Sequence, residues 1–470
     1  MGLFAGGYGD ERRAAAVGRL YGAMVDQSTV VVRRLGGDRG GEVSAHRVLS
    51  SPRVTPAATV GCLARGTSQA AAGLRVVVAQ DTTEVSFPGR AFRSGPGSGP
   101  GSGLGPAGRA GGSPGFFIHA AVAVDADTDD VLGLVDAQLW TREAGAAPGD
   151  APGVRGAGHK RRLAEKESRR WLAGAQAAAE RLAGAAEVVV VGDRESDIYP
   201  LFARRPASAH LLVRAAQNRA TASGTPLFDA PAAWPVMRRH LVHVPASRPG
   251  AGARDAQVTL RAGAVTLRRP RHGRREGDPD SLALSLVEVA EADPPPGAAP
   301  LHWRLLTTLP AGTCAEALEA VRLYGLRWRV EQTFRMLKSD GLQLDEAQTM
   351  DPHRLTNLAA LATGAAVRII QLVDARDGSA RPASDVASPE QLQAAEALGP
   401  TLEGRTDRQK NPHPPASLAW LSWVTARLGG WNCYGKPPGP KTMRAGWNRL
   451  AAIAQGYALA QTTTHDACIP

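Results

Sequence analysis

Cysteine is scarce in this 470-residue chain, which has four widely separated cysteines, Cys62, Cys314, Cys433 and Cys468. Without a CxxC pair, the sequence argues against a zinc site or a disulfide framework and fits a reducing compartment. No apolar run approaches the roughly 18 residues that a membrane span needs. The first residues also lack the apolar core of a signal peptide. We therefore expect a cytoplasmic protein with no membrane partner.

Acidic residues are outnumbered by basic ones, which gives a formal net charge of +11 and a pI near 10.0. A strongly basic chain often binds nucleic acid, because its cations displace counterions condensed on the phosphates. Many basic proteins have no such role, so charge alone is weak evidence. The length is enough for a large core and for two to four domains.

The first region, residues 9–70, has mostly helical spacing of its apolar side chains. Many arginines are spread through it, and they are compatible with either a solvated surface or a DNA contact. These arginines are Arg12, Arg13, Arg19, Arg33, Arg34, Arg39, Arg47 and Arg53.

The next region reads as strands and helices that build a core. A buried strand over 74–81 ends at Asp81, and a second fully apolar strand over 187–193 ends in Asp193. A Gly-rich loop, 94–115, and two further strands follow the first strand. Three strands joined in this way suggest an antiparallel meander. The second strand begins a βαβ-like unit. The remaining elements expected here are strands over 116–125, 131–140 and 210–214 and helices over 160–183 and 198–204.

Residues 215–300 change character, since alternating apolar and polar residues with frequent Gly and Pro predict β-hairpins. The basic run 268–275 within them is either a phosphate contact or, more often for such runs, a solvated loop. A strand over 301–308 follows. After it we expect a helix over 313–339, an apolar helix over 354–374, a linker over 375–388 and a helical C-terminal region with four tryptophans.

One predicted helix carries most of the chemical information. On a continuous helix over 313–339, Tyr324, Arg327, Glu331 and Lys338 would fall within roughly 80° of one another. Arg335 joins the same face. The opposite face is an apolar stripe that packs against the core, formed by Leu323, Leu326, Val330, Phe334 and Leu337.

Three acids, Asp81, Asp193 and Glu331, suggest a metal site. If the strands that end at the two aspartates are neighbours, their carboxylates emerge side by side, with the glutamate added from the helix. Clustered carboxylates repel one another unless cations neutralise them, and hard oxygen ligands suit Mg²⁺ or Mn²⁺. Arg327 and Lys338 could then hold DNA phosphates.

Each of these residues also has an ordinary structural interpretation. An aspartate that closes a strand is often a turn former, and an arginine near a glutamate on a helix is usually a surface pair. Glu195 and Asp197 lie close to Asp193 and could be mistaken for the ligand. His119 lies in mid-strand and is better read as a packed side chain than as a ligand.

The spacing Tyr324-x2-Arg327-x3-Glu331-x6-Lys338 resembles the YREK signature of bacterial insertion-sequence transposases with a DDE active site. Within them, the chain is most similar to the family 4 type, which works by cut-and-paste and has a ribonuclease-H-like core. Other blocks agree with this resemblance. They are Gln80-Asp-Thr-Thr-Glu, Glu165-Lys-Glu-Ser-x-x-Trp171, Gly192-Asp-Arg-Glu-Ser-Asp, Pro352-His-Arg-Leu and Ala426-Arg-Leu-Gly-Gly.

The resemblance implies a residue-by-residue assignment. Asp81, Asp193 and Glu331 become the catalytic triad that binds Mg²⁺ or Mn²⁺. The residues implied to contact the DNA of the element ends are Tyr324, Arg327, Lys338, Arg214 and Trp303, the last by stacking on a flipped base. The implied partners are the terminal repeats and target DNA, both double-stranded, and a second copy of the chain in a synaptic complex, in a nucleoid-associated bacterial protein.

The implied fold is α/β, with a mixed sheet flanked by helices. Its expected divisions are a helical DNA-binding domain over 1–70, a core in two parts over 71–214 and 301–374, an inserted β-rich subdomain over 215–300, and a helical dimerisation region over 375–470. Two other functions stay open. One is a ribonuclease-H-like nuclease that cuts without strand transfer. The other is a non-catalytic DNA-binding protein derived from a transposase, against which three intact acids weigh.

Overall fold

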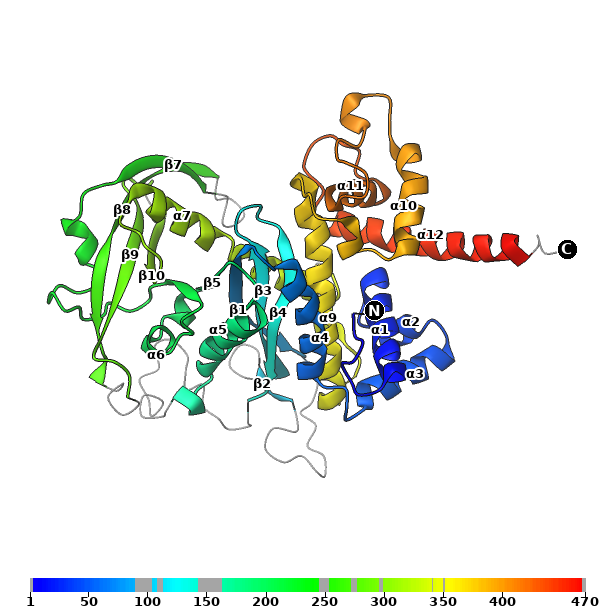
Figure 1. Cartoon of the computed structure of the whole chain (residues 1–470), viewed down its shortest axis with the longest axis horizontal. Helices are drawn as coiled ribbons and strands as arrows, with labels where there is room; N and C mark the ends of the chain where they lie inside the picture. The colour runs from blue at the N-terminus through cyan, green and yellow to red at the C-terminus, as the bar shows by residue number, and fades with distance from the viewer. Residues whose placement is uncertain are drawn as a thin grey trace. The chain divides into compact units, whose positions relative to one another are not determined.

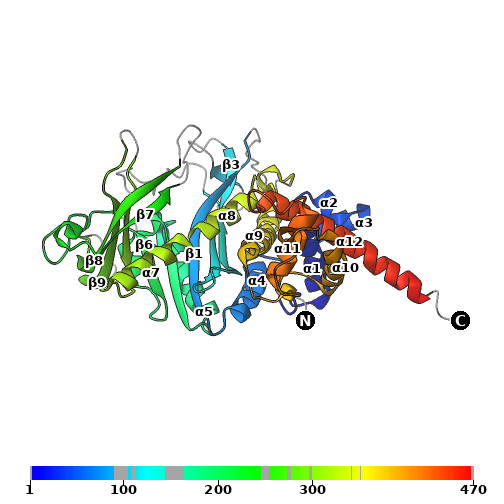
Figure 2. The ribbon, with the colours of Figure 1, turned by 90° about the horizontal axis from the view of Figure 1, so that it is seen from above.

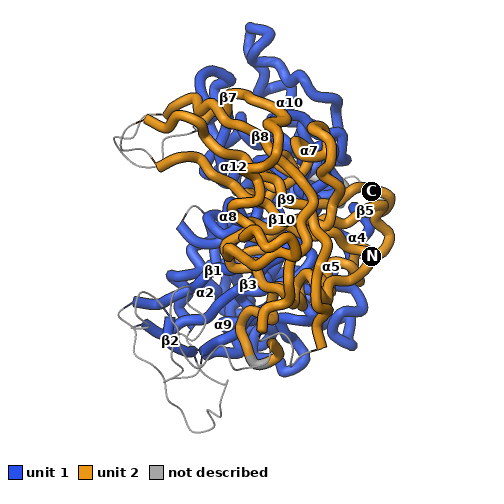
Figure 3. The backbone as a smooth tube through the Cα atoms, turned by 90° about the vertical axis from the view of Figure 1, so that its left-hand side faces the viewer, with its two compact units in different colours: residues 1–71, 82–145, 329–470 blue, residues 72–81, 146–328 orange. Residues whose placement is uncertain are grey.

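The computed structural model describes residues 3–88, 104–107, 113–142, 163–244, 253–271, 277–295, 299–339, 341–349 and 351–466. It is a mixed α/β structure with a mixed sheet flanked by helices. The chain divides into two compact units (Figure 3): unit 1 contains residues 1–71, 82–145 and 329–470, and unit 2 contains residues 72–81 and 146–328. The strand β1 (Arg75–Ser86) and the helix α8 (Trp328–Leu337) each cross the boundary between the two units along the chain.

Unit 2 is built on a sheet with the strand order β1-β5-β6-β10-β9-β8-β7. β1, β5 and β6 run parallel, and the strands from β10 to β7 continue in antiparallel pairs. The expected βαβ-like unit and β-hairpins are therefore confirmed. The strands after β1 are β5 (Glu187–Gly192), β6 (His210–Arg214), β7 (Arg238–Val244), β8 (Arg254–Arg268), β9 (Ser281–Glu291) and β10 (His302–Thr307).

The helices of unit 2 are α5 (Arg169–Arg181), α6 (Tyr199–Ala203) and α7 (Cys314–Gly325). α7 packs against β6, β10, β9 and β8 (Figure 2), and α5 packs against β5. The helix expected over 160–183 is wrong at its start, because a 3-10 turn at Leu163–Glu165 precedes α5. Residues 160–162 of that prediction lie outside the described residues.

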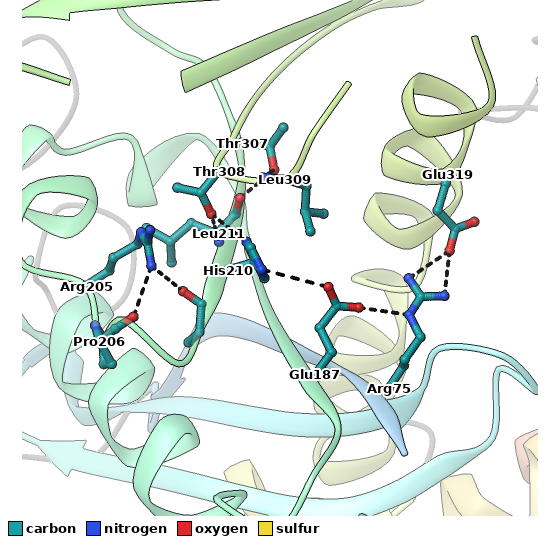
Figure 4. Close-up of polar contacts among 11 residues, drawn as sticks. Arg75, Glu187, Arg205, Pro206, His210, Leu211, Thr307, Thr308, Leu309 and Glu319 are labelled. Atoms are coloured by element: carbon teal, nitrogen blue, oxygen red, sulfur yellow. Dashed lines mark hydrogen bonds and ion pairs between the residues drawn. The ribbon is translucent and has the colours of Figure 1, made fainter. Parts of the chain in front are cut away.

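A network of ion pairs joins α7 to the first residues of the parallel strands (Figure 4). Arg75 Nε lies 2.8 Å from Glu187, and its guanidinium also contacts Glu319 of α7 at 3.3 Å. Glu187 lies 3.9 Å from His210. Arg322 and Arg75 together lower the pKa of the Glu319 carboxyl. Each side chain is roughly one-third exposed, so the network contributes orientation of α7 more than free energy.

Unit 1 holds the strands β2 (Gly105–Ala107), β3 (Ser113–Asp125) and β4 (Val131–Trp140), in which β3 pairs antiparallel with both neighbours. β3 also neighbours β1, as expected from a meander. Parts of the Gly-rich loop 94–115 and of the basic run 268–275 lie outside the described residues. The helices of this unit are α1 (Glu11–Gln27), α2 (Val32–Gly36), α3 (Arg39–Ser50), α4 (Pro56–Ala70), α8, α9 (Pro352–Asp374), α10 (Pro389–Leu402), α11 (Leu418–Leu428) and α12 (Pro440–Asp466).

The core of unit 1 is organised around α9, which lies beside α4 (Figure 1). The expectation that no segment is apolar enough to span a membrane is wrong. The helix over 352–377 passes that test by length and composition, with a mean hydropathy of 1.5. In the structure, 89% of the apolar window is buried, as in the core helix of a folded protein. Cys62, Cys314 and Cys433 are free thiols, and Cys468 lies outside the described residues.

An ion pair between an arginine of α8 and a buried aspartate holds α8 to the end of α9. Arg329 Nη2 lies 2.7 Å from Asp374 Oδ1, and the Asp374 side chain is 8% exposed. Burial raises the pKa of Asp374 to about 6, which the charge of Asp130 supports and that of Arg329 opposes. The folded protein therefore binds a proton at Asp374 more tightly than the unfolded chain does.

We expect this carboxyl to make stability fall as the pH rises from about 4 to about 6, because the native state binds more protons in that window. A rise of the Asp374 pKa from 3.8 to about 6 corresponds to roughly 3 kcal/mol. The measurement is the free energy of unfolding of wild type and of Asp374→Asn at pH 4 and pH 7. The wild-type value should fall relative to the variant's, and a constant difference would contradict the assignment.

Candidate active site

The strand register of unit 2 brings three predicted site residues into one row. The last paired residues of β1 and β5 are Ala79 and Val191. Two residues after each of them stands an aspartate, Asp81 and Asp193. Gly192 is paired with Val213 of β6, so the next residue, Arg214, is level with Asp193. We call Asp81, Asp193 and Arg214 the site row. Neighbouring strands lie about 4.8 Å apart, and residues in one row share a face of the sheet.

The expectation that these two strands are neighbours is confirmed, but one detail of it is wrong. β5 ends at Gly192, one residue before its predicted end, so Asp193 directly follows the strand. β1 does not end at Asp81, because it continues through Thr82 to Ser86. Asp81 is therefore held within a regular strand, with backbone on both sides of it fixed.

α7 covers the face of the sheet on which the site row lies. Arg214 is paired with Leu305, and Trp303, two residues earlier on β10, is on the same face. The ring of Trp303 meets that of Tyr324 edge-to-face, with 5.4 Å between centroids. Tyr324 is 5% exposed. Its burial raises the pKa of the phenol, while the charges of Arg327 and Arg214 act in the opposite direction and Asp193 adds to the rise.

Arginine side chains surround this tyrosine and neutralise the first aspartate. Arg327 Nη1 donates to Asp81 Oδ2 at 2.9 Å, and its guanidinium lies 5.9 Å from the Tyr324 ring centroid. Both partners of this ion pair are mostly buried, with side-chain exposures of 14% and 18%. Arg214 donates to the carbonyl of His302 at 3.1 Å. Burial lowers the pKa of Arg214, and the charges of Arg194 and Arg327 lower it further.

The continuous helix expected over 313–339 is wrong, because it is broken at Leu326 and Arg327. The amide of Leu326 donates to Leu323 and that of Arg327 to Tyr324, which are 3-10 hydrogen bonds rather than α-helical ones. Tyr324 therefore belongs to α7, Arg327 to the break and Glu331 to α8. The predicted apolar stripe from Leu323 to Leu337 is buried as expected.

Glu331 and Lys338 belong to unit 1, whereas the residues of the site row belong to unit 2. Glu331 is partly exposed in the first turn of α8. Burial lowers the pKa of Lys338, an effect that Asp345 and Glu84 oppose. Among the residues that the structure describes, no group of three or more Asp, Glu, His or Cys side chains forms a ready metal site.

The donor set of the site row nevertheless fits a hard divalent cation. Asp81 and Asp193 present carboxylate oxygens at neighbouring positions of two adjacent strands, and such ligands suit Mg²⁺ or Mn²⁺. Arg327 supplies positive charge at Asp81 in the structure.

The nearby acids that could be confused with Asp193 have structural partners. Glu195 pairs with Arg170 at 2.7 Å. Asp197 is fully buried, accepts hydrogen bonds from the amides of Ala216 and Gln217, and pairs with Arg219 at 2.8 Å. His119 is 1% exposed and bonds Thr82 Oγ1 at 3.0 Å, which confirms that it is a packed histidine.

Sequence reasoning missed one charged residue of the site. Arg194 directly follows Asp193 and is exposed, and its positive charge lowers the pKa of Arg214. Its position inside the block Gly192-Asp-Arg-Glu-Ser-Asp was the available signal, because a cation next to a strand-end acid lies at the same edge of the sheet.

A comparison with protein families agrees with this geometry. Residues 152–368 match the family model described as a transposase DDE domain. The matched range begins after Asp81 and includes Asp193, Arg214, Trp303 and Glu331. This match, on a mixed sheet that carries two aspartates side by side, supports a DDE transposase.

Proposed function

We propose that the chain is a cut-and-paste DNA transposase of the insertion-sequence family 4 type, with a YREK signature and a ribonuclease-H-like core. One observation carries the proposal. Asp81 and Asp193 occupy level positions on adjacent parallel strands, beside a cluster of cations and aromatic rings. The family match over residues 152–368 supports it independently.

In this proposal Asp81, Asp193 and Glu331 hold Mg²⁺ or Mn²⁺. Bound divalent ions would activate the attacking hydroxyl and stabilise the leaving oxygen of a phosphodiester. The side chains of the protein bind and orient the DNA around them. Arg214 and Arg327 are mostly buried guanidiniums, which bind phosphate more strongly than exposed ones because less water competes.

In this proposal the aromatic rings of Trp303 and Tyr324 would hold an unstacked base of the DNA. Trp303 is partly exposed and meets the ring of Tyr324 edge-to-face, and in this proposal a base would stack on the exposed part of the indole. Stacking of a base on an aromatic ring is worth about 1–3 kcal/mol. Tyr324 is buried and would orient Trp303 and Arg214, while Lys338 would contact the DNA backbone.

The other parts of the chain have proposed roles as well. The helices over 1–70 would bind the terminal repeats, with their exposed arginines toward phosphates. The β-rich segment over 215–300 would be an insert in the core formed by 71–214 and 301–374. The helices over 375–470 would join two copies in a synaptic complex with element ends and target DNA, in the bacterial cytoplasm near the nucleoid.

The test combines purified protein, Mg²⁺ and DNA that carries the flanking ends of the element. We expect wild type to nick the ends and then join the freed 3′-hydroxyl to target DNA. Glu331→Gln should bind the ends without nicking them, because the amide cannot supply the third carboxylate. Glu180→Gln, an exposed change in the last turn of α5, is the matched control and should act like wild type.

Each alternative predicts a different set of products. Nicking without any joined product would indicate a nuclease. End binding without nicking by wild type would indicate a non-catalytic DNA-binding protein. Equal nicking by wild type and Glu331→Gln would remove that glutamate from the catalytic role.

A further inference from the structure

The helix α5 packs against the two residues that precede the aspartates of the site row. Continuing the register of β1 and β5 by one residue pairs Gln80 with Gly192. We call these two residues the packing row. Successive side chains of a strand point to opposite faces, so the packing row faces away from the site row.

In each contact between α5 and the packing row, a large side chain on one element packs against a glycine on the other. Gly174 of α5 lies against Gln80, and a Cβ on that glycine would be 2.5 Å from Gln80 Oε1. Gly192 lies against Trp171 of α5, and a Cβ there would be 3.4 Å from the indole ring. Trp171 and Gly174 are three residues apart, so they occupy one face of the helix.

The enclosure of these contacts makes them rigid. Gln80 is 0% exposed and Trp171 is 1% exposed. A buried side chain at native packing density has little room to rotate away from an added methyl group. A methyl group added on α5 must therefore displace the enclosed Gln80 side chain, the backbone of β1, or both, and we infer that the backbone moves.

The turn that carries Asp193 depends on the same packing. A Cβ at Gly192 would be 2.3 Å from Ser196 Oγ, which itself donates to the carbonyl of Asp193 at 2.6 Å. Asp193 Oδ1 accepts from the amide of Glu195 at 2.8 Å. Arg170 of α5 pairs with Glu195, so the helix holds this turn from two sides.

We propose that α5 positions the two aspartates. The contacts of Gly174 with Gln80 and of Trp171 with Gly192 fix the placement and rotation of β1 and β5, and they thereby fix the separation of the Asp81 and Asp193 carboxylates. Neither α5 residue contacts the reacting groups. The inference rests on the proposed function for its effect on metal binding, but the geometric part stands independently of that function.

The experiment compares Gly174→Ala with Gly184→Ala, a glycine between α5 and β5 where an added Cβ would meet nothing within 4 Å. Crystal structures of both variants would give the separation of the two carboxylates. Titration with Mn²⁺ alone, followed by electron paramagnetic resonance, would give the affinity. We expect Gly174→Ala to change the separation and lower the affinity about 10–100-fold, as loss of a supporting residue typically does. Gly184→Ala should match wild type in both.

A rescue variant separates positioning from general damage. In Gly174→Ala/Gln80→Ala the smaller side chain makes room for the added methyl, so the wild-type separation and most of the affinity should return. If Gly174→Ala does not fold, Trp171→Phe tests the other contact with the same two measurements. An unchanged separation in the variant that folds would overturn the inference.

Failure of the proposed function would look different. If wild type binds no Mn²⁺, the proposed metal site is wrong. The carboxylate separations in the crystal structures then decide the positioning role on their own.

Discussion

Asp193→Asn should reduce Mg²⁺-dependent nicking about a thousandfold while leaving the fold and the binding of element ends intact. The carboxamide has the same shape, and its oxygen can still accept the hydrogen bond from the amide of Glu195. What the variant loses is one negative charge at the proposed metal site. Metal stabilisation of the transition state is worth several kcal/mol, which corresponds to a loss of about that size in rate.

The matched control is Asp229→Asn, an exposed aspartate of unit 2 without a side-chain cap hydrogen bond. It removes the same charge from the same unit, away from the site row. Single-turnover nicking with saturating protein isolates the chemical step from DNA binding. A loss smaller than tenfold in Asp193→Asn, or an equal loss in the control, would contradict the role of Asp193 as a ligand.

Asp197→Asn is expected to have the largest effect on stability. The Asp197 side chain is 0% exposed and the Arg219 side chain is 7% exposed, so their ion pair is buried. The carboxylate also accepts hydrogen bonds from the amides of Ala216 and Gln217. Removing one partner of a buried pair leaves an uncompensated charge and typically costs about 3–5 kcal/mol.

Urea unfolding of wild type and Asp197→Asn would measure this loss as a lower transition midpoint for unit 2. The double variant Asp197→Asn/Arg219→Met should recover much of it, because no buried charge then lacks a partner. A loss below about 1 kcal/mol would show that water reaches Arg219. Because this pair connects the turn after Asp193 to the segment after Arg214, the unstable variant should also lose activity at lower temperature than wild type.

Much of the core was predictable because its strands are Val-rich and bounded by polar residues. The strand that precedes Asp193 ends within one residue of the predicted end, since Gly192 and the acid after it interrupt the apolar run. The strand through Asp81 was predicted to be too short, because the polar residues Thr82, Thr83 and Glu84 interrupt the apolar run. They remain in β1, which continues to Ser86. The predicted meander gave β1 its partner β3, but it did not show that the pairing extends β1 beyond Asp81.

The break between α7 and α8 had a signal that the periodicity concealed. Gly325 ends α7, as glycine often does at a helix C-terminus, but the apolar stripe continues across it with unbroken spacing. The apolar stripe is buried on both sides of the break. The pattern therefore predicted correctly which residues are buried, but it predicted one continuous helix where there are two. The spacing of Tyr324, Arg327, Glu331 and Lys338 therefore reflects two helices rather than one face.

The packing role of α5 was beyond sequence reasoning for a different reason. Gly174 within a helix looks like a weak helix former, and Gln80 looks like a polar residue at a strand end. Their size complementarity is visible only when the register of β1 and β5 is known. Residues that act through a neighbour leave no spacing pattern of their own.

In the proposed function, the carboxylates of Asp81 and Asp193 bind divalent ions together with Glu331. Crystals of the protein with its end DNA and Mn²⁺, measured at the manganese absorption edge, would locate these ions. We expect anomalous peaks within about 2.0–2.3 Å of carboxylate oxygens of all three residues, and no such peaks in Asp193→Asn. Manganese bound elsewhere, or peaks that persist unchanged in that variant, would contradict this proposal.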